Sequence, residues 1–260
     1  MDVTSTLLAI CILGLITAFT HILSYKYSLF HAIKIDLQQT RYPLFAGILT
    51  LVTLASYIFS FDYLPWYWML ITMIIYLLAA NKTLFLTLFK DKHTLPITSV
   101  WWDAFVGFIL FIVAYPALSL ANNTLEFIFE YGFNLKVPQQ TYIDFIKQIK
   151  QNTSLFVTLF FMGSVIIPLF EEFIYRANIQ TWLKNYLRPY SAILITSLFF
   201  GLSHFFTIET FQGKFVAITL TGLASVYLGW GYERQRSLVT SVVFHGCLNA
   251  QTFLLAYFTT

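Results

Sequence analysis

The chain has 260 residues, of which 58% are hydrophobic and only 10% charged, and its formal net charge is +3. Soluble domains carry about a quarter charged residues, so the composition excludes an ordinary soluble domain and indicates a membrane protein. The few positive charges are spread over connecting segments rather than gathered in one patch, and we expect no nucleic-acid partner.

Hydropathy divides the chain into about eight spans, so we predict an all-α fold, a multi-pass transmembrane helix bundle in the lipid bilayer. The first apolar stretch has no charged region before it and no cleavage site soon after, which favours a retained helix over a signal peptide. In chain order the expected spans are 3–25, 44–61, 64–80, 101–121, 155–175, 191–206, 215–230 and 238–258.

The longest hydrophilic segment is 122–154, and it contains "YIDFIKQIKQ". Its apolar side chains share one helical face, which predicts an amphipathic helix at the membrane interface. The alternative is an ordinary solvated connector. The side chains on this face are Tyr142, Phe145, Ile146 and Ile149.

Lysine and arginine are more frequent in the odd-numbered loops than in the even-numbered ones, which predicts that both termini are outside and the odd loops are cytoplasmic. The odd loops hold Lys26, Lys34, Arg41, Lys82, Lys90, Lys92, Lys184, Arg188, Arg234 and Arg236. The even loops hold Lys136, Lys147, Lys150 and Lys214.

The fifth span contains "VIIPLFEEFIYRANI", with three charged side chains in an apolar run. Charged residues inside a membrane are costly and usually face a protein interior or a water-filled cavity. Glu172 and Arg176 are four residues apart and can form an ion pair on one helix face. Glu171 lies about 100° round the helix and is left without that partner.

Polar side chains also interrupt the sixth and eighth spans. "FFGLSHFF" contains His204, and "FHGCLNA" contains His245 and Asn249, which project from the same helix face. A histidine such as His204 often serves only in packing. If the three spans pack together, however, a carboxylate, two imidazoles and an amide form a hydrolytic site with a base and an oxyanion donor.

Other intramembrane protease chemistries do not fit the sequence. There is no HExxH zinc helix, "GLSH" does not continue into a GxSxG elbow, and no Gly-Asp pair marks an aspartyl site. The aromatic residues around His204 fit an apolar substrate slot or lipid-facing packing, and the high aromatic content favours lipid-facing packing. These residues are Phe199, Phe200, Phe205 and Phe206.

Three motifs together resemble the CAAX protease and bacteriocin-processing family, also called the CPBP or Abi family, which includes the type 2 CAAX prenyl endopeptidases. "EEFIYR" fits EExxxR, "FGLSH" fits FxxxH and "HGCLN" fits HxxxN, in the family's order and each on its own span. The similar region covers roughly residues 150 to 255. In "GYERQRSL", which resembles the approach to the last motif, Gln235 and Arg236 replace a Thr-Gly pair.

The resemblance implies an intramembrane endopeptidase that hydrolyses a peptide bond of a membrane-associated or lipidated substrate. Glu171 would be the general base on a water shared with His204, and His245 and Asn249 would bind the oxyanion. Glu172 and Arg176 would brace the site. A metal-free mechanism is favoured; the alternative is zinc bound by Glu171, His204 and His245.

The resemblance also implies that residues 1–100 are transmembrane helices without a catalytic motif and that residues 101–260 form the catalytic core. The expected location is a multi-pass position in a membrane, the plasma (inner) membrane if the source is bacterial. Two other readings stay open. One is a catalytically inactive binding or immunity protein on the same scaffold, and the other is a proton-coupled transporter.

Overall fold

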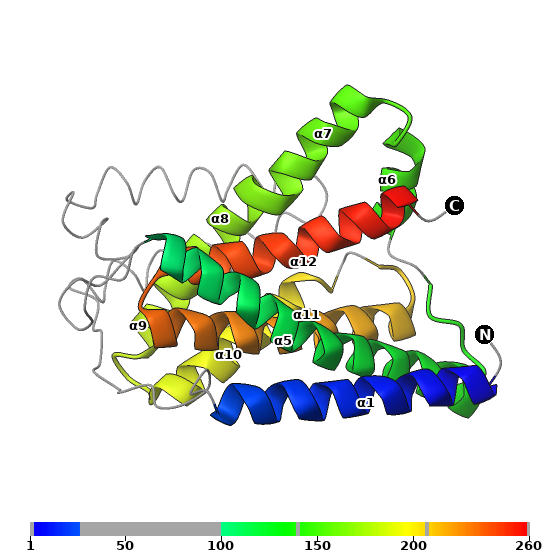
Figure 1. Cartoon of the computed structure of the whole chain (residues 1–260), viewed down its shortest axis with the longest axis horizontal. Helices are drawn as coiled ribbons and strands as arrows, with labels where there is room; N and C mark the ends of the chain where they lie inside the picture. The colour runs from blue at the N-terminus through cyan, green and yellow to red at the C-terminus, as the bar shows by residue number, and fades with distance from the viewer. Residues whose placement is uncertain (1–2, 27–99, 139–140, 206–207, 259–260) are drawn as a thin grey trace.

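The computed structural model describes residues 3–26, 100–138, 141–205 and 208–258, and these residues form helices with no strand among them (Figure 1). The predicted all-α bundle is therefore confirmed for the described part of the chain. The expected spans 44–61 and 64–80 lie outside the described residues. The described helices are α1 (Val3–Lys26), α5 (Val100–Phe127), η1 (Ile128–Gly132), α6 (Thr141–Ile149), α7 (Thr153–Phe161), η2 (Met162–Ile166), α8 (Ile167–Glu172), η3 (Phe173–Gln180), α9 (Thr181–Leu183), α10 (Pro189–Ser203), α11 (Phe211–Gln235) and α12 (Leu238–Phe258).

Five helical stretches of the described chain are long and apolar enough to cross a membrane, and the protein is an integral membrane protein. They are Val3–Ser24, Val100–Gly132, Thr153–Leu183, Phe211–Gln235 and Leu238–Phe258. A crossing of the hydrocarbon core needs about 20 helical residues. Each of the five meets that length.

Two predicted spans need correction. The helix expected over 101–121 continues through η1 to Gly132, so the first part of the predicted hydrophilic segment is helical. The span expected over 191–206 is the 15-residue helix α10. At 1.5 Å per residue it is about 22 Å long, short of the roughly 30 Å hydrocarbon core. Pro189 occupies its first turn, a position that favours a helix start, and His204 follows its last residue.

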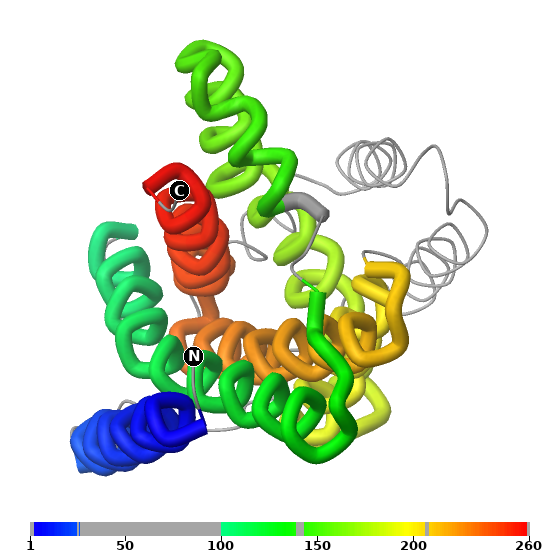
Figure 2. The backbone as a smooth tube through the Cα atoms, turned by 90° about the vertical axis from the view of Figure 1, so that its right-hand side faces the viewer, coloured from blue at the N-terminus to red at the C-terminus, as the bar shows by residue number. Residues whose placement is uncertain are grey.

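Helix α12 is the centre of the bundle. It packs against α5, α11, α6 and the helix that contains η2 and α8 (Figures 1 and 2). Small residues allow the close contacts: a Cβ added at Gly107 on α5 would lie 2.5 Å from the carbonyl oxygen of Thr240 on α12. Helix α1 lies along α5 at the outside of the bundle.

The predicted amphipathic helix is α6, but protein covers part of its apolar face. Ile146 and Ile149 are buried, and Ile146 packs with Phe253 and Ala256 of α12. Phe145, predicted on the same face, is instead 48% exposed. The core therefore holds α6 through isoleucines one turn apart.

The turn between α11 and α12 forms although the sequence lacks the glycine of the resembled motif. Arg236 adopts φ 50° and ψ 38°, the left-handed conformation that commonly ends a helix. Glycine takes this conformation without steric cost, whereas other residues are destabilised there by roughly 1–3 kcal/mol. Arg236 is only 4% exposed, so its side chain is packed inside the protein.

Candidate active site

The helix over Thr153–Leu183 changes its winding twice around the paired glutamates. The π-helical segments η2 and η3 flank the short α8, whose last two residues are Glu171 and Glu172. π-helical segments are rare and occur frequently at functional sites. The expected span over 155–175 lies within this helix, but hydropathy does not report the hydrogen-bond register and could not predict the π-helical segments.

Glu172 and Arg176 form the predicted ion pair, with Arg176 Nε 3.0 Å from Glu172 Oε2 and both side chains fully buried. Arg176 also donates through Nη2 to Ser225 Oγ of α11 at 3.1 Å. Its guanidinium lies 5.3 Å from the centroid of the Phe200 ring. Contacts from three helices therefore fix the position of this cation.

His245 lies between the two glutamates. Its Nδ1 is 2.9 Å from Glu172 Oε1, and its Nε2 is 3.5 Å from Glu171 Oε2. Since an ionised carboxylate only accepts hydrogen bonds, Nδ1–H donates to Glu172 and Nε2 faces Glu171. The sequence did not reveal that Glu172 orients His245 in addition to pairing with Arg176.

The two carboxylates differ in their access to water. The side chain of Glu171 is 14% exposed, whereas that of Glu172 is 0% exposed. Glu172 is occupied by a guanidinium and an imidazole. Of the pair, Glu171 is therefore the carboxylate that a water molecule can reach.

His204 follows the last residue of α10, and its Nδ1 donates to the carbonyl oxygen of Phe200 at 2.9 Å. In the neutral imidazole this leaves Nε2 as the acceptor. The Phe200 ring contacts both imidazoles, with centroids 5.0 Å from His204 and 5.7 Å from His245. Phe200 is 2% exposed, so lipid-facing packing was the wrong expectation for this residue, while Phe205 is 39% exposed.

Asn249 lies one turn after His245 and donates through Nδ2 to the carbonyl oxygen of Gly163 at 2.8 Å. An asparagine amide carries two N–H donors, and one of them is used in this bond. The other is left to donate to a group beside Asn249. The motifs do not predict this bond to Gly163.

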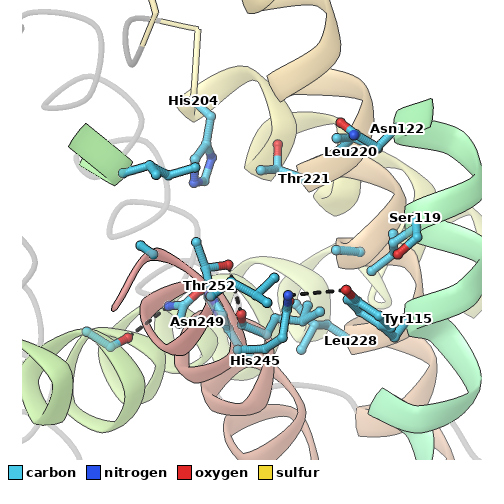
Figure 3. A pocket seen from close by; sticks show the side chains of 18 of the residues that line it. Tyr115, Ser119, Asn122, His204, Leu220, Thr221, Leu228, His245, Asn249 and Thr252 are labelled. Atoms are coloured by element: carbon cyan, nitrogen blue, oxygen red, sulfur yellow. Dashed lines mark hydrogen bonds between the residues drawn. The ribbon is translucent and has the colours of Figure 1, made fainter. Parts of the chain in front are cut away.

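A cavity of about 770 Å³ lies beside these residues, and His204, His245 and Asn249 line it together with Phe200. Figure 3 shows His204 entering from one side, across from Thr221, with His245 and Asn249 on the α12 wall. The α5 wall carries Tyr115, Ser119 and Asn122. The volume of the cavity is in the range of ligand pockets.

The residues named for a zinc site do not gather into one. Among the described residues, no three His, Cys, Asp or Glu side chains form a group that could hold a metal ion. Glu171 and His245 are neighbours, but the ring of His204 stands apart from His245 in the cavity. This geometry does not fit a zinc ion held by the three residues.

Residues 153–251 match the family model described as Type II CAAX prenyl endopeptidase Rce1-like. This part of the chain is similar to the CAAX prenyl endopeptidases. The matched region includes all six candidate residues, from Glu171 to Asn249. In the corresponding comparisons, no curated protein and no solved structure matches the chain. The similarity therefore rests on the region that contains the three motifs.

Proposed function

We propose that this protein is an intramembrane endopeptidase of the CAAX type that cleaves a membrane-associated or lipidated peptide with water. The observation that carries the proposal is the imidazole of His245, which lines the cavity and lies between two carboxylates. Of these two, only Glu171 is partly exposed, at 14%. A buried structural ion pair explains Glu172 and Arg176. It does not explain a partly exposed second carboxylate beside His245, or a second histidine and an asparagine that line the same cavity.

In the proposed reaction Glu171 takes a proton from water, and the oxygen of that water bonds to the carbonyl carbon of the scissile peptide. The Nε2 acceptor of His204 helps to hold the water. The remaining N–H of Asn249 donates to the oxyanion, together with Nε2–H of His245 when that imidazole is protonated. The carbon–nitrogen bond then breaks, and Glu171 returns the proton to the leaving amine.

Glu172 and Arg176 position the reacting groups rather than react. Glu172 accepts from Nδ1 of His245 and thereby fixes the orientation of the ring. We propose that the catalytic unit begins with α5, as expected for residues 101–260, because Tyr115 and Ser119 of α5 line the cavity although they precede the matched region. In the proposed mechanism the reacting residues act without a metal.

The test is cleavage of membrane peptides by the purified protein in lipid nanodiscs. The substrates would be apolar peptides with and without a prenylated cysteine, incubated in H₂¹⁸O and analysed by mass spectrometry. We expect one ¹⁸O atom in the new carboxylate of the N-terminal product. A matched control is Glu130→Gln, which removes an exposed carboxylate outside the cavity and should cleave normally.

The alternatives predict other results. Binding of peptides without any cleavage would contradict the proposal and favour an inactive binding or immunity protein. Proton uptake into sealed vesicles without cleavage would favour a proton-coupled transporter.

A further inference from the structure

The helix that carries Glu171 contains a carbonyl group that has no donor at the α-helical or the π-helical spacing. At the α-helical spacing the donor to the Gly163 carbonyl would be Ile167, but its N–H donates to the carbonyl of Met162. At the π-helical spacing the donor would be residue 168, which is a proline without an N–H. Buried carbonyl groups need a partner, so this oxygen requires one from outside the helix.

Asn249 supplies that partner from α12. Its Nδ2 lies 2.8 Å from the Gly163 oxygen, across 86 positions of the sequence. The two helices approach closely here, because Gly246 of α12 lies against the carbonyl oxygen of Ser164. A Cβ added at Gly163 would lie 2.5 Å from the ring of Phe253. The close contact brings the amide of Asn249 within reach of the carbonyl.

This bond determines which way the amide group points. A carbonyl oxygen only accepts, so the NH₂ end of Asn249 must face Gly163, and a flipped amide would place two acceptors against each other. One N–H is held in this bond, and the second is the donor required at the proposed oxyanion. The orientation of Asn249 thus depends on the oxygen of Gly163 having neither an α-helical nor a π-helical donor.

We infer that Pro168, together with the π-helical segment Met162–Ile166, positions Asn249 by leaving the Gly163 carbonyl for its side chain. Pro168 is a positioning residue, since it acts through Gly163 and Asn249. The catalytic consequence rests on the proposed function, whereas the hydrogen-bond consequence does not. The two are therefore measured separately.

The test is Pro168→Ala, which supplies an N–H five residues after Gly163. NMR spectra are recorded on the detergent-solubilised protein with ¹⁵N-labelled asparagine. The Asn249 side-chain signals are identified as those that disappear in Asn249→Ala. We expect them to shift and to lose protection from hydrogen exchange in Pro168→Ala. A matched control is Pro116→Ala, which also adds an N–H inside a membrane helix, on α5, and should leave these signals unchanged.

Cleavage rates give the second readout. Asn249→Ala should lower kcat about 10²- to 10³-fold, as does loss of one oxyanion donor in other enzymes. Pro168→Ala should lower kcat about 10-fold with KM unchanged, and the double variant should be no slower than Asn249→Ala alone, because both changes act through one amide. If Pro168 had only a structural role, the losses of kcat in the two single variants would instead multiply in the double variant.

Unchanged Asn249 signals in Pro168→Ala would overturn the inference, and so would multiplied losses of kcat in the double variant. If the signals shift but even the wild-type protein cleaves no peptide, the proposed function fails while the positioning of Asn249 stands.

Discussion

Two buried ion pairs lie in the same helix bundle and differ in what surrounds them. Arg176 Nε is 3.0 Å from Glu172, and Lys184 Nζ is 2.7 Å from Glu233, with at most 1% exposure of any of the four side chains. Glu172 is also bonded to His245, which lines the cavity. Glu233 is bonded to Gln180, and neither it nor Lys184 lines the cavity.

The comparison shows that burial of charge is not by itself a sign of function. A buried pair is costly to break but often replaceable by apolar residues, whether or not it serves chemistry. What distinguishes Glu172 is its second bond, to an imidazole at the cavity wall. Variants of the two pairs should therefore agree in stability and differ in turnover.

Removing one carboxylate from either buried ion pair should produce the largest loss of stability. Glu172→Gln leaves Arg176 without its carboxylate, and Glu233→Gln does the same to Lys184, so each should lower the free energy of unfolding by about 3–5 kcal/mol. Thermal unfolding in detergent measures this loss. Turnover per folded molecule should fall only for Glu172→Gln; an equal fall for Glu233→Gln would remove the distinction between the pairs.

Removing both charges of a pair should sharpen the contrast. Glu172→Gln with Arg176→Met, and Glu233→Gln with Lys184→Met, should each melt at a higher temperature than the single glutamine variant, because no orphan charge remains. The first double variant should still turn over about 10- to 100-fold more slowly than wild type, since His245 has lost its orienting carboxylate. The second should turn over normally, and a slow second variant would speak against the account.

Loss of the Phe200 ring, which contacts Arg176, should have a smaller effect on stability and turnover than loss of Glu172. Phe200→Leu keeps an apolar side chain but removes the contacts of the ring with Arg176 and with the imidazoles of His204 and His245. We expect a stability loss of about 1–2 kcal/mol from the cation–π contact and a measurable fall in turnover. Phe199→Leu, one position earlier and outside the cavity, is the control; similar turnover in both variants would argue against a role for the ring.

Ser225 should give the smallest effect. Ser225→Ala removes the hydroxyl that accepts from Arg176 at 3.1 Å and leaves its backbone oxygen at 3.4 Å. We expect a stability loss of about 1 kcal/mol, measured by thermal unfolding. Thr219→Val on the exposed part of α11 should be neutral by comparison. A loss as large as that of Glu172→Gln would mean that Ser225 anchors the arginine more than Glu172 does.

The sequence was informative about features that repeat locally along the chain. Apolar runs predicted most of the described membrane helices, and the spacing of Glu172 and Arg176 predicted their ion pair because residues four apart meet on one helix. The motifs also predicted that His204, His245 and Asn249 meet at one cavity.

Contacts between distant segments could not be predicted in the same way. Lys184 is one of the loop cations in the charge comparison, but it is buried and paired with Glu233. This weakens the predicted orientation in the membrane. The bond from Asn249 to Gly163 joins residues on separate helices and depends on a π-helical register, which hydropathy does not encode.

The central claim is that Glu171 acts as the base while Glu172 holds the site together. It is tested most directly by measuring turnover and thermal unfolding of Glu171→Gln, which keeps the shape of the side chain and removes the proton acceptor. The account predicts a folded protein with a melting temperature near that of wild type and turnover about 10²- to 10⁴-fold lower. Near-normal turnover, or an unfolded Glu171→Gln beside a stable and inactive Glu172→Gln, would contradict it.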